Sequence, residues 1–283
     1  MSDPDGTRNP PQIAALALGE DTEYPDRYDP ALLRGVARSL NRDDLGLTGE
    51  LPFHGSDAWT AYEISWLDPL GKPRVAIGQF SFPCTSPNLV ESKSLKLYLN
   101  GFNQTRMRSV GEVKGRIAED LTGCAGAVVT VELLLPNEWH REGIEGLPGE
   151  CIDDLPVEID EYTLNPALLY GAASGPMVTE TLHSNLLKSN CLVTNQPDWG
   201  SVLVRYCGPR IDRAELLRYL ISYRQHSEFH EQCVERIFWD VLHHCHPARL
   251  TVYARYTRRG GLDINPFRSN FETPPGNVRL ARQ

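Results

Sequence analysis

The sequence lacks an apolar run long enough to cross a membrane. A membrane-spanning helix needs about 20 mostly apolar residues in a row, and no such run occurs among the 283 residues. The segment Met1–Arg8 is polar and acidic, whereas a secretory signal starts with a basic stretch that an apolar one follows. We therefore expect a cytoplasmic protein with no membrane partner.

Paired cysteines are also lacking. The seven cysteines are odd in number and scattered along the chain, and no two of them form a CxxC motif. This usage is typical of reduced thiols in a cytosolic protein rather than of a disulfide framework. The run His243–His246 holds three histidines and a cysteine, but contiguous residues on a helix point in different directions and do not match the spacing of zinc ligands. We expect no metal site.

Positive charge is scarce as well. The formal net charge is -9 at pH 7, which argues against a nucleic-acid partner, because such binding needs a broad surface that neutralises phosphates. No GxGxxG motif follows a predicted strand, so a Rossmann dinucleotide-binding domain is not expected. With 41% hydrophobic and 23% charged residues, the remaining composition is that of a globular enzyme.

Three regions follow one another along the chain. Residues 1–55 are a lead-in with Pro and Gly punctuation, one short predicted helix over Pro30–Leu40 and no recognisable chemistry. Residues 56–160 are predicted to form a first module. Its pattern predicts a hairpin (Tyr62–Trp66 and Arg74–Phe82), a helix over Asn88–Leu99 capped by Asn88, a second helix over Ser109–Leu121 and a strand over Ala127–Leu135.

Residues 161–283 are predicted to form a second module with the same order of elements. It holds a hairpin (Leu186–Asn195 and Gly200–Tyr206), a turn at Gly208 and Pro209, helices over Arg213–Gln225 and Glu228–His244, and a closing strand over Arg249–Tyr256. Prolines and acidic residues between 136 and 170 indicate a linker between the modules. The repeated order predicts an α+β fold in which helices cover one face of antiparallel sheets.

A cysteine and an aspartate frame a stiff polar turn in the second module. Cys191 ends a predicted strand, and Asp198 follows Pro197 a few residues later. Such a turn can hold both side chains near one point, where a thiolate attacks an electrophilic carbon and a carboxylic acid protonates the nitrogen that becomes anionic. Taken alone, the pair fits a buried structural thiol and a turn carboxylate at least as well.

Polar and cationic residues gather around a predicted helix start in the first module. Glu91 is followed by Ser92, Lys93, Ser94 and Lys96, at a place where backbone donors and the helix dipole favour anions. Such a place can hold a phosphate. The same residues also suit an amphipathic helix whose lysines are simply solvated.

His230 and Glu231 stand at another predicted helix start, in the second module. A carboxylate there can accept two N–H bonds from the edge of a guanine-like ring. Beyond the next strand, Arg258 and Arg259 precede Gly260, a pattern that suits a phosphate and in particular a 2′-phosphate. A charged helix cap and a basic turn fit these residues equally well.

Together these segments resemble the QueF family, the NADPH-dependent 7-cyano-7-deazaguanine reductases of queuosine biosynthesis, in its long two-module form. The resemblance runs from about residue 50 onward, and no key position departs from the family pattern. It is most specific in four segments: ESKSLKLYLNGFN (Glu91–Asn103), CLVTNQPDWGS (Cys191–Ser201), FHE (Phe229–Glu231) and YTRRGGLDINPFRS (Tyr256–Ser269).

The resemblance implies two tandem tunnelling-fold (T-fold) modules, a homodimer and the reduction of a nitrile to a primary amine with two NADPH. It also implies that Cys191 adds to the nitrile carbon of a 7-deazaguanine substrate to form a thioimide, and that Asp198 donates the proton. The substrate-binding residues that it implies are Val90, Glu91, Ser92, His230 and Glu231. The residues that would contact NADPH are Ser92, Lys93, Arg259 and Gly260.

Three other functions stay open on the sequence. A cysteine-dependent nitrile or amide hydrolase would use the same thiol with water in place of hydride, although no general-base histidine lies beside Cys191 in the chain. A zinc-dependent cyclohydrolase of the same superfamily would need a Cys/His ligand set, which the sequence does not offer. A non-catalytic purine-binding module would bind its ligand through Glu91 and Glu231 and leave Cys191 structural.

Overall fold

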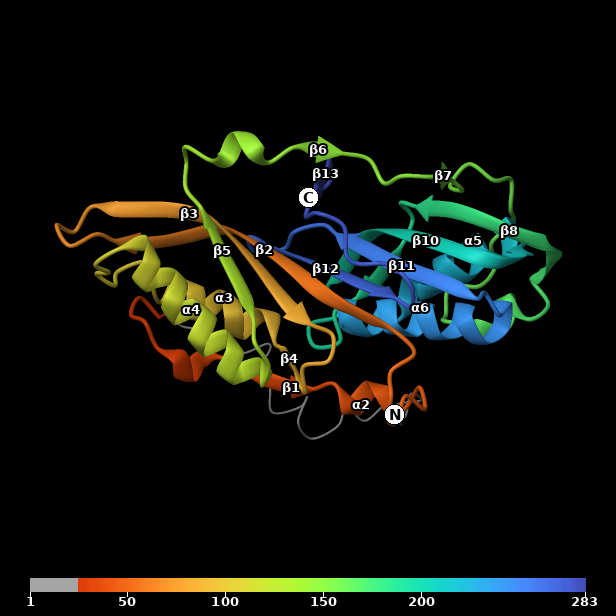
Figure 1. The fold of residues 1–283 in the computed structure, drawn as a ribbon, viewed down its shortest axis with the longest axis horizontal. Coiled ribbons are helices and arrows are strands. Elements are labelled where there is room, and N and C mark those ends of the chain that lie inside the picture. Colours follow the sequence, from red (N-terminus) through yellow and green to blue (C-terminus); the bar gives the residue numbers. More distant parts are fainter. Residues whose placement is uncertain (1–24) are drawn as a thin grey trace, which may run out of the picture.

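One long sheet runs through the molecule. The computed structural model describes residues 25–283, so the first part of the predicted lead-in lies outside the described residues. The longer helices cover one face of the sheet (Figure 1). Nine strands of the described chain belong to the sheet, which is antiparallel except for one short pairing at its edge. The predicted α+β fold, with helices on one face of antiparallel strands, is confirmed.

The strands and helices have the following bounds. Across the sheet the strands are β5 (Thr130–Leu134), β3 (Pro73–Pro83), β2 (His54–Leu67), β12 (Leu262–Ser269), β11 (Arg249–Tyr256), β10 (Pro197–Ile211), β8 (Ala173–Ser184) and β7 (Glu150–Cys151), and β9 (Lys188–Asn190) pairs with β10. The longer helices are α3 (Ser92–Asn100), α4 (Val110–Ala125), α5 (Arg213–Ser222) and α6 (His230–Cys245). No helix within residues 25–283 is both long and apolar enough to span a membrane.

Short elements complete the chain. They are the 3-10 turns η1 (Pro30–Leu32), η2 (Trp139–Arg141), η3 (Pro166–Leu169) and η4 (Tyr223–Gln225), the helix α2 (Ser39–Arg42), and the strands β1 (Gly35–Ala37), β4 (Asn88–Val90), β6 (Ile144–Glu145) and β13 (Arg279–Leu280). Strands β6 and β13 lie over the face of the sheet that the helices leave open (Figure 1).

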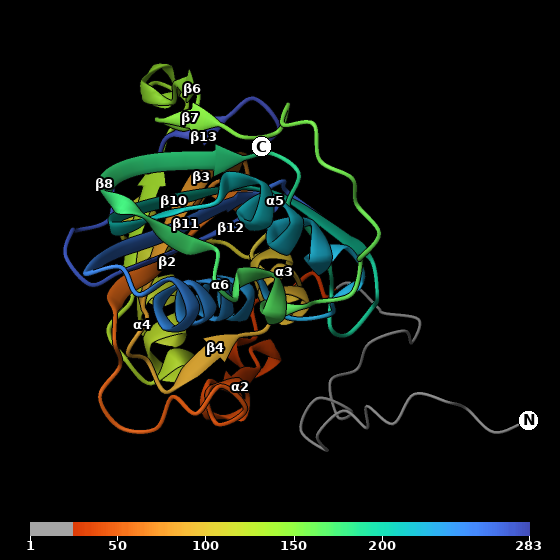
Figure 2. The same ribbon diagram turned by 90° about the vertical axis from the view of Figure 1, so that its right-hand side faces the viewer.

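The two halves of the chain meet where β12 pairs with β2. The pairing runs from Leu262 opposite Ala61 to Ser269 opposite His54, so one continuous sheet serves both halves. Each half has a core of its own, one packed around α3 and α4 and the other around α5 and α6. The view turned by 90° shows α4 and α6 beneath the same side of the sheet (Figure 2). A division of the chain near residue 160 stays a prediction.

Elements with strong local signals are confirmed. Strands β2 and β3 form the predicted hairpin, and β11 has the predicted bounds, Arg249–Tyr256. Helix α4 begins directly after Ser109, whose side chain accepts a hydrogen bond from the backbone N–H of Glu112, and ends at Gly126 in the left-handed conformation with φ 72°. Glycine takes this conformation without steric cost, which explains why the helix stops there.

The helix predicted over Pro30–Leu40 is wrong. In its place the chain forms η1, then β1, then α2, and β1 pairs antiparallel with β4. The apolar spacing of the segment is helical, but Val36 is buried by this long-range pairing, opposite Leu89. The tertiary contact therefore overrides the local preference.

The start of the next helix was also misplaced. Helix α3 begins at Ser92, after β4, and its cap is Glu91 rather than Asn88. The side-chain amide of Asn88 donates to the backbone carbonyl of Cys124 at 3.1 Å, so it anchors β4 to α4 instead of capping a helix.

The strands of the second half differ most from the prediction. The strand predicted over Leu186–Asn195 is reduced to β9, and β8 and β12 were not predicted. Gly208 and Pro209 lie inside β10 rather than in a turn. The register of β10 against β8 shifts between Pro209 and Ile211, and such a bulge accommodates a proline that cannot donate to the ladder.

Candidate active site

A narrow cleft lies where the two halves of the chain meet. Its empty volume is about 360 Å³. All predicted catalytic and substrate-binding residues line it, together with Arg259, whereas Lys93 and Gly260 are not among the described residues of its lining. The full lining is Val36, Trp59, Leu89, Val90, Glu91, Ser92, Cys191, Asp198, Glu228, Phe229, His230, Glu231, Arg259 and Ile264.

A tight turn between β9 and β10 presents Cys191. The backbone N–H of Cys191 donates to the carbonyl of Gln196 at 2.8 Å, and the N–H of Asn195 donates to the carbonyl of Cys191 at 2.9 Å. Asn195 has φ 52°, a left-handed conformation that asparagine tolerates better than most residues. Asp198 follows at the start of β10, opposite Ser189. The turn thus fixes the thiol and the carboxylate relative to each other.

The thiol of Cys191 sits in a setting that favours its ionised form. Burial opposes the charge, but hydrogen bonds from Thr194 and Arg259 outweigh burial and lower the pKa of Cys191 below its usual value. A thiolate is the nucleophilic form of cysteine. The other buried cysteines differ, since burial raises the pKa of Cys84 and of Cys245.

The setting of Asp198 favours the protonated, uncharged form of its carboxyl group. Its side chain lies in the cleft with 6% of its surface exposed. Burial raises its pKa to about 6, against the pull of Arg259, Lys96 and Lys188. One oxygen lies 3.0 Å from the Arg259 guanidinium and 3.7 Å from Nε2 of His230. A carboxyl group with this pKa can carry a proton near neutral pH and give it up, as a general acid must.

The first turn of α6 places two further predicted residues in the cleft. Burial, and then the positive charges of Arg259 and Lys96, lower the pKa of His230 to about 3, so the imidazole is neutral at pH 7. Its ring packs edge-on against Tyr256 at a centroid distance of 4.0 Å. Burial, and then the nearby charge of Asp57, raise the pKa of Glu231 to about 8. Among the described residues Glu231 makes no ion pair.

Glu91 faces the cleft from the start of α3. Its carboxylate accepts hydrogen bonds from the backbone N–H groups of Lys93 at 2.8 Å and of Ser94 at 2.7 Å. The cap therefore uses two of the backbone donors that the sequence offered to a phosphate. A phosphate site at the start of α3 stays a prediction. The bonds fix the orientation of the Glu91 carboxylate.

A basic rim borders the cleft. Lys96 is partly buried, and burial, followed by the charge of Arg259, lowers its pKa. Gly260 has φ 58° and packs closely on this side chain, since a Cβ at Gly260 would lie 3.2 Å from Cδ of Lys96. Lys96 belongs to the cationic cluster that the sequence places at the start of this helix, one helical turn after Ser92.

A buried ion network supports the α6 side of the cleft. Arg268 contacts both Asp57 and Glu235 at 2.7 Å. Two arginines of the lead-in join it: Arg38 lies 2.6 Å from Asp57, and Arg42 lies 2.7 Å from Glu235. The lead-in was expected to carry no chemistry. Its part in this network is structural: it helps to fix the helix that carries Glu231, one turn before Glu235.

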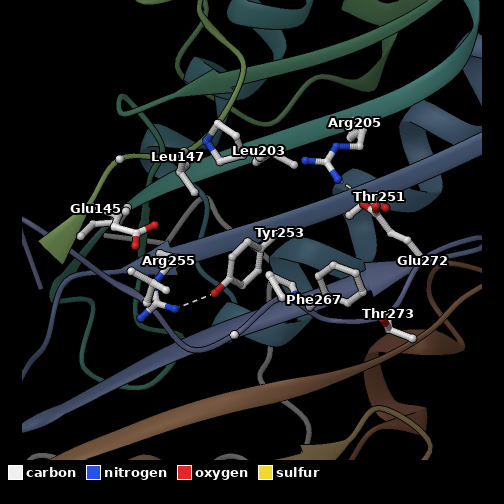
Figure 3. Close-up of a pocket in the computed structure, with 16 residues that line it drawn as sticks. Glu145, Leu147, Leu203, Arg205, Thr251, Tyr253, Arg255, Phe267, Glu272 and Thr273 are labelled. Atoms are coloured by element: carbon white, nitrogen blue, oxygen red, sulfur yellow. Dashed lines mark hydrogen bonds and ion pairs between the residues drawn. The ribbon is translucent and has the colours of Figure 1, made fainter. Parts of the chain in front are cut away.

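A second, larger cavity lies on the other face of the sheet, under β6 and β13. It has an empty volume of about 860 Å³ and none of the predicted site residues in its lining. Figure 3 shows two polar contacts in its wall: Arg255 donates to the hydroxyl of Tyr253, and Arg205 lies 2.8 Å from Glu272. Burial raises the pKa of the Tyr253 hydroxyl in this lining, but among the described residues no cysteine, histidine or aspartate lines the cavity. The cleft instead brings Cys191, Asp198 and His230 together, so it is the candidate active site.

Comparison with known proteins bears on this assignment. Residues 24–133 match a family model described as nitrile reductase, 7-cyano-7-deazaguanine-reductase N-term, and residues 197–275 match one described as QueF-like protein. Together the matched ranges span about two thirds of the chain, and Cys191 falls between them.

One solved structure is reported alongside. It is the archaeosine synthase QueF-Like in the apo form, at 18% sequence identity and a TM-score of 0.31, with 36% of this chain and 99% of that chain covered. This likeness is too slight to carry an argument. Because the two family models match in order along both halves, the chain belongs to the QueF family of nitrile reductases, the 7-cyano-7-deazaguanine reductases of queuosine biosynthesis.

Proposed function

We propose that this protein reduces the nitrile of 7-cyano-7-deazaguanine to an aminomethyl group through a covalent thioimide on Cys191, with NADPH as the reductant. The observation that carries the proposal is the opposite tendency of two neighbouring groups in one cleft. The pKa of Cys191 is lowered and the pKa of Asp198 is raised, to about 6. The thiol is therefore easier to ionise, and the carboxyl group easier to protonate, than the same side chains free in water, which suits a nucleophile beside a proton donor.

The first step needs both groups at once. A nitrile accepts hydride poorly, so it must be activated. The Cys191 sulfur forms a bond to the nitrile carbon, one carbon–nitrogen π bond breaks, and the nitrogen takes the proton of Asp198. The product is a thioimide. Arg259 then lies beside the carboxylate that Asp198 has become, at 3.0 Å in the described structure.

The later steps return the thiol. Two NADPH molecules, bound one after the other, would each supply one hydride to the former nitrile carbon. After the first, the nitrogen lone pair expels the Cys191 sulfur and leaves an imine, which water would hydrolyse. The pocket must therefore exclude water until the second hydride arrives. Phe229 and His230 line the cleft and are the proposed lid.

Recognition of the heterocycle falls to two carboxylates from different halves. Glu91 comes from α3 and Glu231 from α6, and both are nearly buried in the cleft. Carboxylate oxygens accept hydrogen bonds from the N–H groups of a guanine-like edge. Val90 and Ser92 extend the wall beside Glu91. The substrate would thus join the two halves of the protein.

The basic rim is suited to NADPH. Arg259 and Lys96 are cations at the mouth of the Cys191 cleft, and Gly260 allows close approach of the backbone there. Lys93 and Ser92 would contribute from the start of α3. We expect the enzyme to act in the cytoplasm as a homodimer, as the family resemblance implies.

A hydrolase using the same thiol has less support. It would need a histidine base beside Cys191. His230 instead lies 3.7 Å from Asp198, and its pKa of about 3 makes it a weak base. A binding module without catalysis gives no reason for the lowered pKa of Cys191.

The proposal is tested by intact-mass spectrometry. Protein incubated with 7-cyano-7-deazaguanine and no NADPH should gain the mass of one substrate molecule. Cys191→Ala should abolish the gain, whereas Cys151→Ala, which removes an exposed thiol, should keep it. Wild-type protein without an adduct would refute the covalent mechanism, and release of a carboxylic acid without NADPH would indicate a hydrolase.

A further inference from the structure

The indole N–H of Trp59 is a buried donor without an acceptor. Trp59 lies on β2 opposite Ile264 of β12, and both residues line the active-site cleft. Only 1% of the Trp59 surface is exposed. Its Nε1 has no hydrogen-bond partner within the described part of the chain.

An unpaired buried donor needs an explanation. Burying an N–H group removes its hydrogen bonds to water, and proteins nearly always replace them. The packing around the ring does not do so, because its close neighbours are apolar: the ring of Phe82 lies 5.4 Å away between centroids. The donor thus lowers the stability of the folded protein unless something else supplies the acceptor.

The acidic groups nearby are already engaged. The two oxygens of Glu91 accept from the backbone at the start of α3. Asp57, which shares the inward face of β2 with Trp59, is held by Arg38 and Arg268. The exception is Glu231, which also lines the cleft and makes no ion pair within residues 25–283, but it does not accept from the indole either.

We propose that Trp59 is a specificity-determining residue, whose indole N–H donates a hydrogen bond to an acceptor on the bound heterocycle, either its ring carbonyl oxygen or a ring nitrogen. The inference rests on the proposed function. In their ionised forms Glu91 and Glu231 recognise only the N–H groups of such a ring, because carboxylates only accept. A pyrimidinone edge also carries acceptors, and Trp59 recognises one of these.

This assignment has a consequence for substrate choice. A ring that carries an amino group in place of the carbonyl oxygen would set a donor against the donor of Trp59. Buried polar groups left unpaired in this way are strongly disfavoured, more than a missing apolar contact. Trp59 would therefore exclude adenine-like rings that the apolar walls alone would admit.

The hydrogen bond can be observed directly by NMR. The chain has five tryptophans, so a ¹H–¹⁵N spectrum shows five indole signals, and the one lost in Trp59→Phe identifies Trp59. In Cys191→Ala protein, which cannot form the adduct, addition of 7-cyano-7-deazaguanine should move the Trp59 proton signal downfield. An unmoved Trp59 signal at saturating ligand overturns the inference.

Affinities give an independent measurement. In the Cys191→Ala background, Trp59→Phe should weaken binding of 7-cyano-7-deazaguanine about tenfold, the size expected for one buried hydrogen bond. Two analogues are then compared: one lacks the ring carbonyl oxygen and the other lacks the ring nitrogen of the same edge. The analogue that lacks the acceptor of Trp59 should bind equally well to the proteins with Trp59 and with Trp59→Phe. Trp66→Phe is the matched control, because Trp66 lies on the same strand and in the same core but does not line the cleft.

The outcomes separate this inference from the proposed function. Two results would overturn the role of Trp59 alone while adduct formation stays normal. In the first, Trp59→Phe loses the same affinity for 7-cyano-7-deazaguanine and for both analogues. In the second, it loses affinity for none of the three. Wild-type protein that neither binds 7-cyano-7-deazaguanine nor forms the adduct would overturn both.

Discussion

The guanidinium of Arg259 lies 3.0 Å from the carboxylate of Asp198 and also donates to the side chain of Gln196 at 2.6 Å. It therefore holds the end of the turn that leads from Cys191 into β10. The same cation lowers the pKa of the Cys191 thiol. One arginine thus influences the nucleophile and the acid together, and it is also a candidate contact for NADPH.

Arg259→Gln should raise the pKa of Cys191, because the positive charge that favours the thiolate is lost. Alkylation of Cys191 by iodoacetamide, followed by peptide mass spectrometry across a pH series, should shift to higher pH. Arg258→Gln is the matched control: the Arg258 guanidinium lies over the ring of Tyr62, 4.7 Å from its centroid. An unchanged alkylation profile in Arg259→Gln would show that Arg259 does not tune the thiol.

Asp198→Asn should slow adduct formation about a hundredfold or more, since the amide has no proton to give. Binding of the substrate should change far less. In the wild type the pKa of Asp198 is about 6, so the donor form is present below that pH and is lost as pH rises through it. The rate of adduct formation, divided by the fraction of Cys191 that is ionised, should fall as pH rises through the pKa of Asp198. This fall should be absent in Asp198→Asn. Near-wild-type turnover in the variant would exclude the proton-donor role.

Glu231 should release a proton when substrate binds at pH 7. Its pKa of about 8 in the unliganded protein leaves it mostly protonated there, whereas N–H donors of the substrate favour the carboxylate. Calorimetry in two buffers of different ionisation enthalpy should give different binding enthalpies at pH 7 and nearly equal ones at pH 9. Glu231→Gln should remove the buffer dependence at pH 7. Equal enthalpies in the wild type at both pH values would contradict the assignment.

The parts of the fold that could be predicted are those with local causes. Helix α4 has a serine cap, and β11 is a run rich in β-branched and aromatic residues, so the start of α4 and the bounds of β11 follow from short segments. Helix α4 ends at Ala125 rather than at the predicted Leu121. The segment 30–40 failed because its partner is β4, more than 50 residues away. Helical spacing in a short segment does not reveal such a partner.

The site follows the same division. Cys191 and Asp198 are joined by a short turn, so adjacent residues in the sequence predict that the two side chains lie close together. Trp59 could not be identified from the sequence, because no neighbouring residue in the chain marks it as part of a binding site. It reaches the cleft only because β2 pairs with β12, some 200 residues later along the chain. Residues that depend on such pairings need the structure.

The buried ion network should be essential for the stability of the α6 side of the cleft. Arg268 is fully buried and contacts Asp57 and Glu235, each at 2.7 Å. Arg268→Met leaves two buried carboxylates with too few partners, which should cost about 3–5 kcal/mol in the free energy of unfolding. Urea denaturation measures this loss.

Arg205→Met is the matched control, because Arg205 pairs with Glu272 where both side chains are partly exposed. This change should cost less than about 1 kcal/mol in the free energy of unfolding. Equal losses in the two variants would mean that burial of the network does not set its importance. A larger loss in Arg268→Met, with weaker substrate binding in the fraction that stays folded, would link the network to the position of Glu231.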